Sequence, residues 1–159
     1  MCIHFIRRML ILARAEGTIP MTNAATVADA KLADAEIVRR YLELSMIPDP
    51  DAAAQYMKPG TIITFTGGRE FDSPRGPTAF NKNRYRWVKK KMDRFDICPG
   101  KDETIVYSVG TLYGEWPDGT PFEGNRYVDR FVVRGGQIVK MDVWNDSAER
   151  ILTRREIKA

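Results

Sequence analysis

Two polar residues stand where the surrounding pattern favours apolar ones. Tyr41 lies on the apolar face of an amphipathic segment, and Asp129 lies among alternating apolar residues. A phenol and a carboxyl group that share a dry pocket could donate hydrogen bonds to an oxygen that gains negative charge. An isolated ionised carboxylate would be costly there, so we expect Asp129 to be neutral, strongly hydrogen-bonded or paired with a polar group. The alternative is that Asp129 bonds a loop or solvent at the pocket mouth.

Histidine and cysteine add little further chemistry. His4 is the only histidine, and the two cysteines, Cys2 and Cys98, are far apart in the chain without a CxxC spacing. We therefore expect no zinc site, no disulfide and no organic cofactor. Acid-base chemistry in the folded part would have to use carboxylates, tyrosines or lysines.

Length and composition indicate one ordinary globular domain. The chain has 159 residues, of which 43% are hydrophobic and 29% are charged. We expect the domain to span residues 21–159 and to follow a poorly packed leader at 1–20, with Met1 and Met21 as alternative starts. The apolar run of the leader, residues 9–13, is too short to cross a membrane, so we expect a cytoplasmic protein without membrane contact.

The spacing of apolar residues predicts helices first and strands later. Helices are expected over 27–46, over 52–57 after the cap Asp49-Pro50, and over 78–92. Strands are expected over 61–66, 94–98, 104–116, 123–133 and 138–146. This order predicts an α+β fold in which a curved, largely antiparallel sheet wraps the N-terminal helices as a cone. The concavity between the two layers is the expected ligand site.

The connection between the last two strands decides which side chains face that concavity. A two-residue turn at Gly135-Gly136 would place Asp129 opposite Asp142, which is unfavourable for two like charges. A three-residue loop over 134–136 places Asp129 opposite Met141 and separates an apolar face from a charged one. We expect this second register, with Asp129 as the only charge on the buried face.

Three segments resemble the ketosteroid isomerase branch of the nuclear transport factor 2-like superfamily, which also includes SnoaL-like polyketide cyclases and scytalone dehydratase. They are residues 40–44, 127–131 and 137–141, and the similarity covers roughly residues 27–146. The resemblance implies the cone-shaped fold. It also implies that Tyr41 and Asp129 match the tyrosine and the protonated aspartic acid that stabilise the enolate in the isomerases.

The resemblance does not extend to the general base. The isomerases carry an aspartate at the stretch that corresponds here to Thr64-Phe65-Thr66, and the histidines of the dehydratases are also missing. The acids that could replace the base are Asp72, Glu115, Glu123 and Asp142. We expect a cofactor-independent isomerase, dehydratase or cyclase for an apolar compound with a carbonyl or hydroxyl group. The alternative is a non-catalytic module of the same fold that binds a ligand or a protein.

The resemblance also implies a lining for the pocket and an outer face for association. The expected pocket residues are Phe65, Trp87, Leu112, Trp116, Tyr127, Phe131, Met141, Val143 and Asn145. Gly110 and Gly114 share the inward face, where they would either deepen the cavity or let the strand bend. Tyr107, Tyr113 and Glu115 would face outward, on the surface expected to form a homodimer.

A basic stretch lies between Lys82 and Arg94, with seven Lys or Arg residues against one acid, Asp93. Together with Tyr85 and Trp87 it could hold a nucleic acid. We favour a solvated helix face that attracts a small anionic molecule. The expected partner is therefore a small apolar or anionic organic ligand, and not a nucleic acid.

Overall fold

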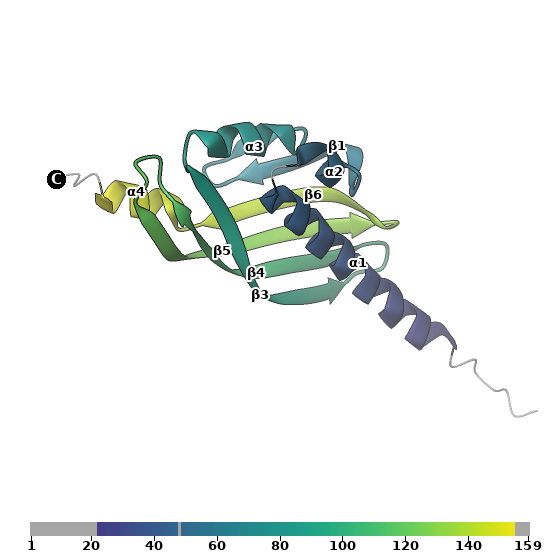
Figure 1. Cartoon of the computed structure of the whole chain (residues 1–159). Helices are drawn as coiled ribbons and strands as arrows, with labels where there is room; N and C mark the ends of the chain where they lie inside the picture. The colour runs from purple at the N-terminus through teal and green to yellow at the C-terminus, as the bar shows by residue number, and fades with distance from the viewer. Residues whose placement is uncertain (1–21, 48, 155–159) are drawn as a thin grey trace, which may run out of the picture.

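The computed structural model describes residues 22–47 and 49–154, so the expected leader, with Met1 and Met21, lies outside the described residues. A curved six-stranded sheet carries helices on its concave side (Figure 1). The elements are α1 (Thr22–Met46), α2 (Pro50–Ala54), β1 (Met57–Phe65), β2 (Arg69–Phe71), α3 (Arg75–Lys82), β3 (Trp87–Pro99), β4 (Thr104–Glu115), β5 (Pro121–Arg134), β6 (Gln137–Asn145) and α4 (Ser147–Arg154). The predicted α+β cone is confirmed.

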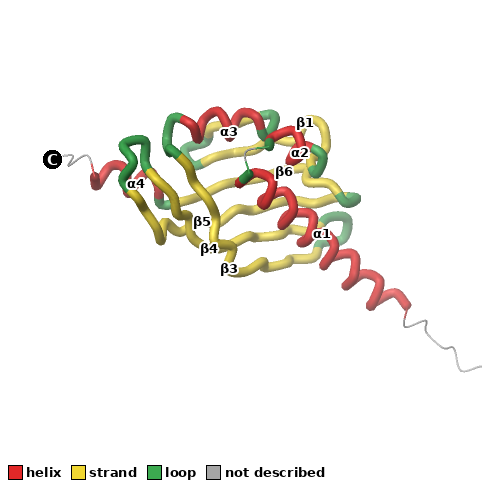
Figure 2. The backbone as a smooth tube through the Cα atoms, in the orientation of Figure 1, coloured by secondary structure: helices red, strands yellow, loops and turns green. Residues whose placement is uncertain are grey.

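The sheet is mixed, with the strand order β2-β1-β6-β5-β4-β3. Strands β1 and β6 are parallel, and every other neighbouring pair in this sheet is antiparallel. Helix α1 crosses the concave side and contacts β3, β4 and β6 (Figure 2). The long chain segment between β1 and β6 is what allows these two strands to pair in parallel.

Helix α1 buries one stripe of side chains against the sheet. Val38, Tyr41 and Leu42 follow the i, i+3, i+4 spacing and are all buried in the main core cluster. The Tyr41 ring meets the edge of Phe131 on β5, with 5.8 Å between the ring centroids. Tyr41 is therefore held rigidly at the interface between helix and sheet.

All three predicted helices have different bounds, and the first, α1, begins at Thr22 rather than at 27. The predicted helix over 78–92 is wrong beyond Lys82, where α3 ends and the chain turns into strand β3. Val88, Lys90 and Met92 alternate toward the interior of the sheet, so a lysine in the middle position hides the apolar period of two. The short helix ends at Ala54 rather than 57 because Met57 starts β1; β2 and α4 were not predicted.

The predicted register of the last hairpin is also wrong. The turn has two residues, Gly135 and Gly136, with φ of 56° and 74°, and Val139 is then left unpaired as a bulge. Asp129 consequently lies opposite Val143 instead of Met141. Because the difference is two residues, the predicted face of each side chain on β5 is nevertheless correct.

Strand β3 lies unusually close to the inner face of β4. A Cβ atom on Gly110 would collide with the carbonyl of Lys91, and one on Gly114 would collide with the carbonyl of Trp87. Neither glycine lines the cavity described below. Their role is therefore to let β3 curl over β4, which is the second of the two predicted alternatives.

Candidate functional site

A cavity of about 410 Å³ opens between α1, α3 and the inner face of the sheet. Six of the predicted pocket residues line it: Phe65, Trp87, Leu112, Met141, Val143 and Asn145. Tyr41 of α1 lines it as well. The cavity is thus an apolar space with a phenol in its wall, within the size range of small-molecule sites.

Three predicted pocket residues do not line this cavity and are buried beside it. Trp116 stacks on Phe122 with 4.4 Å between centroids, and Phe131 packs on Tyr41. Tyr127 lies below Lys90 of β3, whose ammonium nitrogen is 3.9 Å from the centre of the Tyr127 ring. These three aromatic side chains are therefore packed behind the residues that line the cavity.

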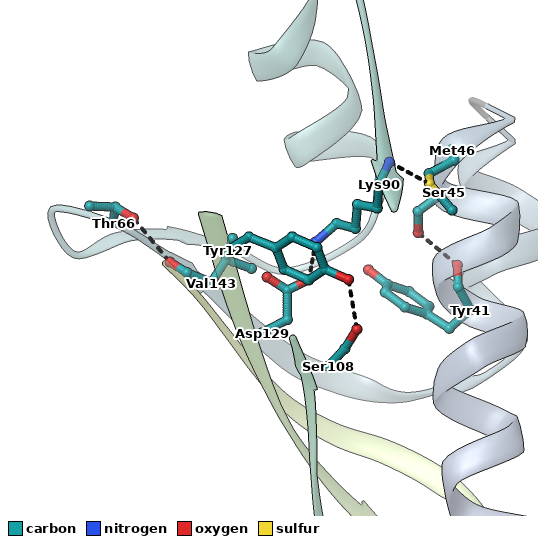
Figure 3. Close-up of polar contacts among 9 residues, drawn as sticks. All are labelled: Tyr41, Ser45, Met46, Thr66, Lys90, Ser108, Tyr127, Asp129 and Val143. Atoms are coloured by element: carbon teal, nitrogen blue, oxygen red, sulfur yellow. Dashed lines mark hydrogen bonds and ion pairs between the residues drawn. The ribbon is translucent and has the colours of Figure 1, made fainter. Parts of the chain in front are cut away.

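Lys90 is the functional candidate that sequence reasoning missed. Its side chain lines the cavity, retains 16% of its exposure, and forms an ion pair with Oδ2 of Asp129 (Figure 3). Asp129 itself does not line the cavity, because Lys90 reaches it from the neighbouring wall. Val88 and Met92 alternate with it along β3, but Lys90 itself interrupts the apolar period of two, and the stretch was predicted as a helix.

The carboxyl group of Asp129 is fully buried, with no exposed surface. Burial raises its pKa, and the charge and hydrogen bond of Lys90 oppose that rise. Oδ2 accepts from Lys90, whereas Oδ1 has no hydrogen-bond partner in the described part of the chain. A buried carboxyl oxygen without a partner costs free energy, because no hydrogen bond compensates its loss of hydration.

Two phenols accompany this pair. The hydroxyl of Tyr127 lies 2.9 Å from Oγ of Ser108, and burial raises the pKa of Tyr127 to about 12. Burial also raises the pKa of Tyr41, and the nearby charge of Asp129 adds to that effect. The Tyr41 hydroxyl points from α1 toward Tyr127 and Asp129 (Figure 3). Both phenols therefore remain protonated near neutral pH and can donate hydrogen bonds.

The end of α1 is tied to the strand that carries Lys90. The backbone N–H of Lys90 donates to Sδ of Met46 over 2.9 Å. One residue earlier in α1, the Ser45 hydroxyl donates to the backbone carbonyl of Tyr41, one turn before it, over 2.8 Å. Tyr41 and Lys90 thus come from two elements that contact each other directly at the cavity wall.

The cavity is lined by cations and by no acid. Lys82, Arg86 and Lys89 line it with Lys90, whereas none of its described lining residues is Asp or Glu. Most of the basic stretch is therefore part of the strand β3 and the cavity rim, and not of one helix face as predicted. This arrangement favours a ligand with negative charge or with electron-rich oxygens.

The four acids proposed as replacement bases lie elsewhere. Asp72 and Glu123 are exposed, Glu115 pairs with Arg86 over 3.4 Å, and Asp142 pairs with Arg130 over 3.1 Å. None of the four lines the cavity. Among the described ion pairs, two carboxyl groups contact a lining residue: Glu115 contacts the exposed Arg86, and the buried Asp129 contacts Lys90.

Within 22–47 and 49–154, no helix combines the length and the hydropathy that a membrane span requires. Nor do three or more His, Cys, Asp or Glu side chains of this part of the chain gather in a way that could hold a metal ion.

Comparison with known proteins identifies the fold. No protein-family model and no curated protein sequence matches the chain. Among solved structures, an NTF2-like protein of unknown function from Burkholderia pseudomallei has 18% identity and a TM-score of 0.61, covering 80% of this chain and 98% of that one. A putative SnoaL-like polyketide cyclase from Jannaschia has 18% identity and a TM-score of 0.60, covering 77% and 91%.

A third structure carries a bound small molecule. A protein with a ketosteroid isomerase-like fold from Catenulispora acidiphila, in complex with trimethylamine, has 16% identity and a TM-score of 0.55, covering 69% of this chain and 84% of that one. At these identities the likeness concerns the fold alone, and it confirms the resemblance predicted from the sequence at that level.

Proposed function

We propose that this chain, which has the nuclear transport factor 2-like fold, binds a small apolar compound and polarises its carbonyl or hydroxyl oxygen. The reaction class is isomerisation, dehydration or cyclisation without a cofactor. The observation that carries the proposal is the convergence of Tyr41, Lys90 and the buried Asp129 at one wall of the cavity.

The donors that would face the substrate are the Tyr41 hydroxyl and the Lys90 ammonium group. Both residues line the cavity, and Asp129 holds Lys90 from behind. Fixed donors in a site with little water stabilise a developing oxyanion far better than mobile water does. Compared with the prediction from sequence, Asp129 would act partly through Lys90 instead of touching the substrate oxygen alone.

A test is the binding of 2-naphthol, whose naphtholate form resembles an enolate. Tyr41→Phe and Asp129→Asn should each weaken binding about tenfold or more, equivalent to about 1.4 kcal/mol. The first removes a donor, and the second removes the charge that holds Lys90 in place. Fluorescence titration measures the affinity, and circular dichroism shows that each variant is folded.

The matched control is Tyr113→Phe, which removes an equivalent hydroxyl from an exposed ring outside the cavity lining. Its affinity for 2-naphthol should equal that of the unaltered protein. Unchanged affinity in folded Tyr41→Phe and Asp129→Asn would refute the proposal.

The second candidate is a non-catalytic binding module with the same cavity. The absence of any Asp or Glu among the described lining residues favours it, since a proton-transfer enzyme needs a base. Turnover of a panel of ketones and β-hydroxy compounds separates the two: an enzyme consumes at least one of them, and Asp129→Asn slows that reaction.

We also propose that the chain is a cytoplasmic homodimer that associates through the convex face of the sheet. Tyr113, Val128 and Trp144 expose large apolar surface; Val128 and Trp144 are paired across β5 and β6. Exposed apolar patches commonly mark protein interfaces. Sedimentation velocity should show a dimer that Trp144→Glu converts to a monomer; a monomer in the unaltered protein would contradict this.

A further inference from the structure

We propose that Lys90 is an amine nucleophile that forms an imine with the carbonyl carbon of a compound bound in the cavity. This deepens the proposed function, and it rests on that function in one respect, namely that the cavity accepts a carbonyl compound. It adds covalent chemistry to a site that would otherwise act by hydrogen bonds alone.

The first support is the placement of the amine. Lys90 lines the cavity with a side chain that is only 16% exposed, and its nitrogen sits between the Oδ2 atom of Asp129 and the face of Tyr127 (Figure 3). Lys82, Lys89 and Lys91 from the same stretch are all exposed to water. Lys90 is thus the lysine of this stretch that combines a dry surrounding with a carboxylate partner.

The second support is the state of the carboxyl group. Asp129 has no exposure, and Oδ1 has no hydrogen-bond partner among the described residues. The Oδ2 atom of Asp129 contacts the Lys90 nitrogen, so this carboxylate is placed to take up one proton of the ammonium group when a carbonyl compound enters the cavity. The transfer produces the uncharged amine that can attack a carbonyl carbon.

The covalent step balances with the groups that are present. The nitrogen lone pair of Lys90 forms a C–N bond, the carbonyl π electrons move to oxygen, and a proton from Asp129 gives a neutral hydroxyl group. Loss of a second nitrogen proton and of this hydroxyl releases one water molecule and forms the C=N bond. The sum is that an ammonium and a carbonyl compound give an iminium and water, with Asp129 returned to its starting carboxylate.

The product cation would remain where the ammonium was. An iminium at Lys90 keeps its positive charge beside Asp129 and over the Tyr127 ring, where a cation is already held at 3.9 Å. The Tyr41 hydroxyl, which points to this group, is placed to donate to the carbonyl oxygen before water leaves. The described side chains therefore suit both the attack and its product.

The test uses 2,4-pentanedione, a small 1,3-diketone that converts a neutral amine into an enaminone with a strong near-ultraviolet band. Peptide mapping of the unaltered protein after limited labelling should place the mass increase on Lys90 at least about tenfold ahead of Lys82, Lys89 and Lys91. Even labelling of these lysines, or no label on Lys90, overturns the inference without the need for any variant.

Two variants sharpen the result. Lys90→Arg keeps a cation for Asp129 but should lose the enaminone band, whereas the control Lys91→Arg, at an exposed lysine outside the cavity lining, should keep it. Folded Asp129→Asn should slow labelling of Lys90 by roughly 100-fold, because it cannot take up the ammonium proton. An unchanged labelling rate in this variant would contradict the assigned proton transfer.

Failure of this inference is distinguishable from failure of the proposed function. If 2-naphthol binding depends on Tyr41 and Asp129 but no enaminone forms, the proposed oxyanion site is supported and the proposed imine at Lys90 is refuted. If Lys90 is labelled selectively while 2-naphthol binding ignores both substitutions, the reactive amine stands and the oxyanion site falls.

Discussion

Neighbouring residues on β5 form ion pairs on opposite faces of the sheet. Asp129 pairs with Lys90 on the concave face, and Arg130 pairs with Asp142 on the convex face. The side chains of Asp129 and Lys90 keep 0% and 16% of their exposure, whereas those of Asp142 and Arg130 keep 11% and 25%. The same type of contact therefore exists in two dielectric surroundings only one residue apart.

The difference shows what water does for an ion pair. On the convex face, solvent and the additional contact from Lys140 at 3.5 Å compensate Asp142. On the concave face, Asp129 has Lys90 for one oxygen and no partner for the other. A buried pair gains little net stability, but removing one member leaves a charge that nothing compensates. Loss of one partner should therefore matter more for the inner pair than for the outer pair.

The largest expected effect comes from breaking the inner pair. Lys90→Met should lower the free energy of unfolding by about 3–5 kcal/mol at neutral pH, because it strands the Asp129 carboxylate. Chemical denaturation measures the change. On the convex face, the matched substitution Arg130→Met should cost less, about 1 kcal/mol, since this pair is less buried and Lys140 remains beside Asp142. Equal costs for the two substitutions would abolish the contrast between the faces.

A smaller effect should appear as a pH dependence of stability. Burial raises the pKa of Asp129 above its ordinary value of 3.8 in the folded protein. The folded state thus binds the Asp129 proton more tightly than the unfolded state does. The stability that this proton contributes is complete below pH 3.8 and is lost as the pH rises through the pKa of Asp129 in the folded protein. The slope cannot exceed about 1.4 kcal/mol per pH unit for one proton.

Denaturation curves between pH 4 and pH 8 check this slope. Asp129→Asn should remove it, because an amide does not titrate, whereas Asp142→Asn on the convex face should leave it in place. Persistence of the slope in folded Asp129→Asn would assign it to another group.

Much of the fold could be predicted because its local patterns agree with its tertiary contacts. The stripe of Val38, Tyr41 and Leu42 on α1 fixed the face of that helix, and Asp49 accepts the cap hydrogen bond from Ala52 over 3.0 Å. On β5, alternation placed Asp129 on the buried face although its predicted partner was two residues away. The face on which a side chain lies depends only on the strand's period of two. The register between β5 and β6 depends in addition on the bulge at Val139, which no residue type in the sequence indicates.

The most informative residue of the site could not be found in this way. Lys90 lies among six other basic residues in a stretch where solvated positive charge is the ordinary expectation. Its inward direction depends on the curl of β3 and on a carboxylate 39 residues further along the chain. A contact between residues so far apart in the chain cannot be seen in the local hydrophobic pattern. The charge of Lys90 at an inward position also interrupts the alternation of apolar residues that would indicate a strand.

Gly110 and Gly114 set the proximity of the two charges without touching either of them. Their missing side chains let the edge strand fold inward, and Lys90 lies on that strand between the residues paired with them, Met92 and Val88. A methyl group at either glycine would push β3 away from β4 and move the ammonium group of Lys90 outward. Every polar residue of the site would still be present in the sequence. Two positions without a functional group thus determine where the ammonium group of Lys90 lies inside the cone.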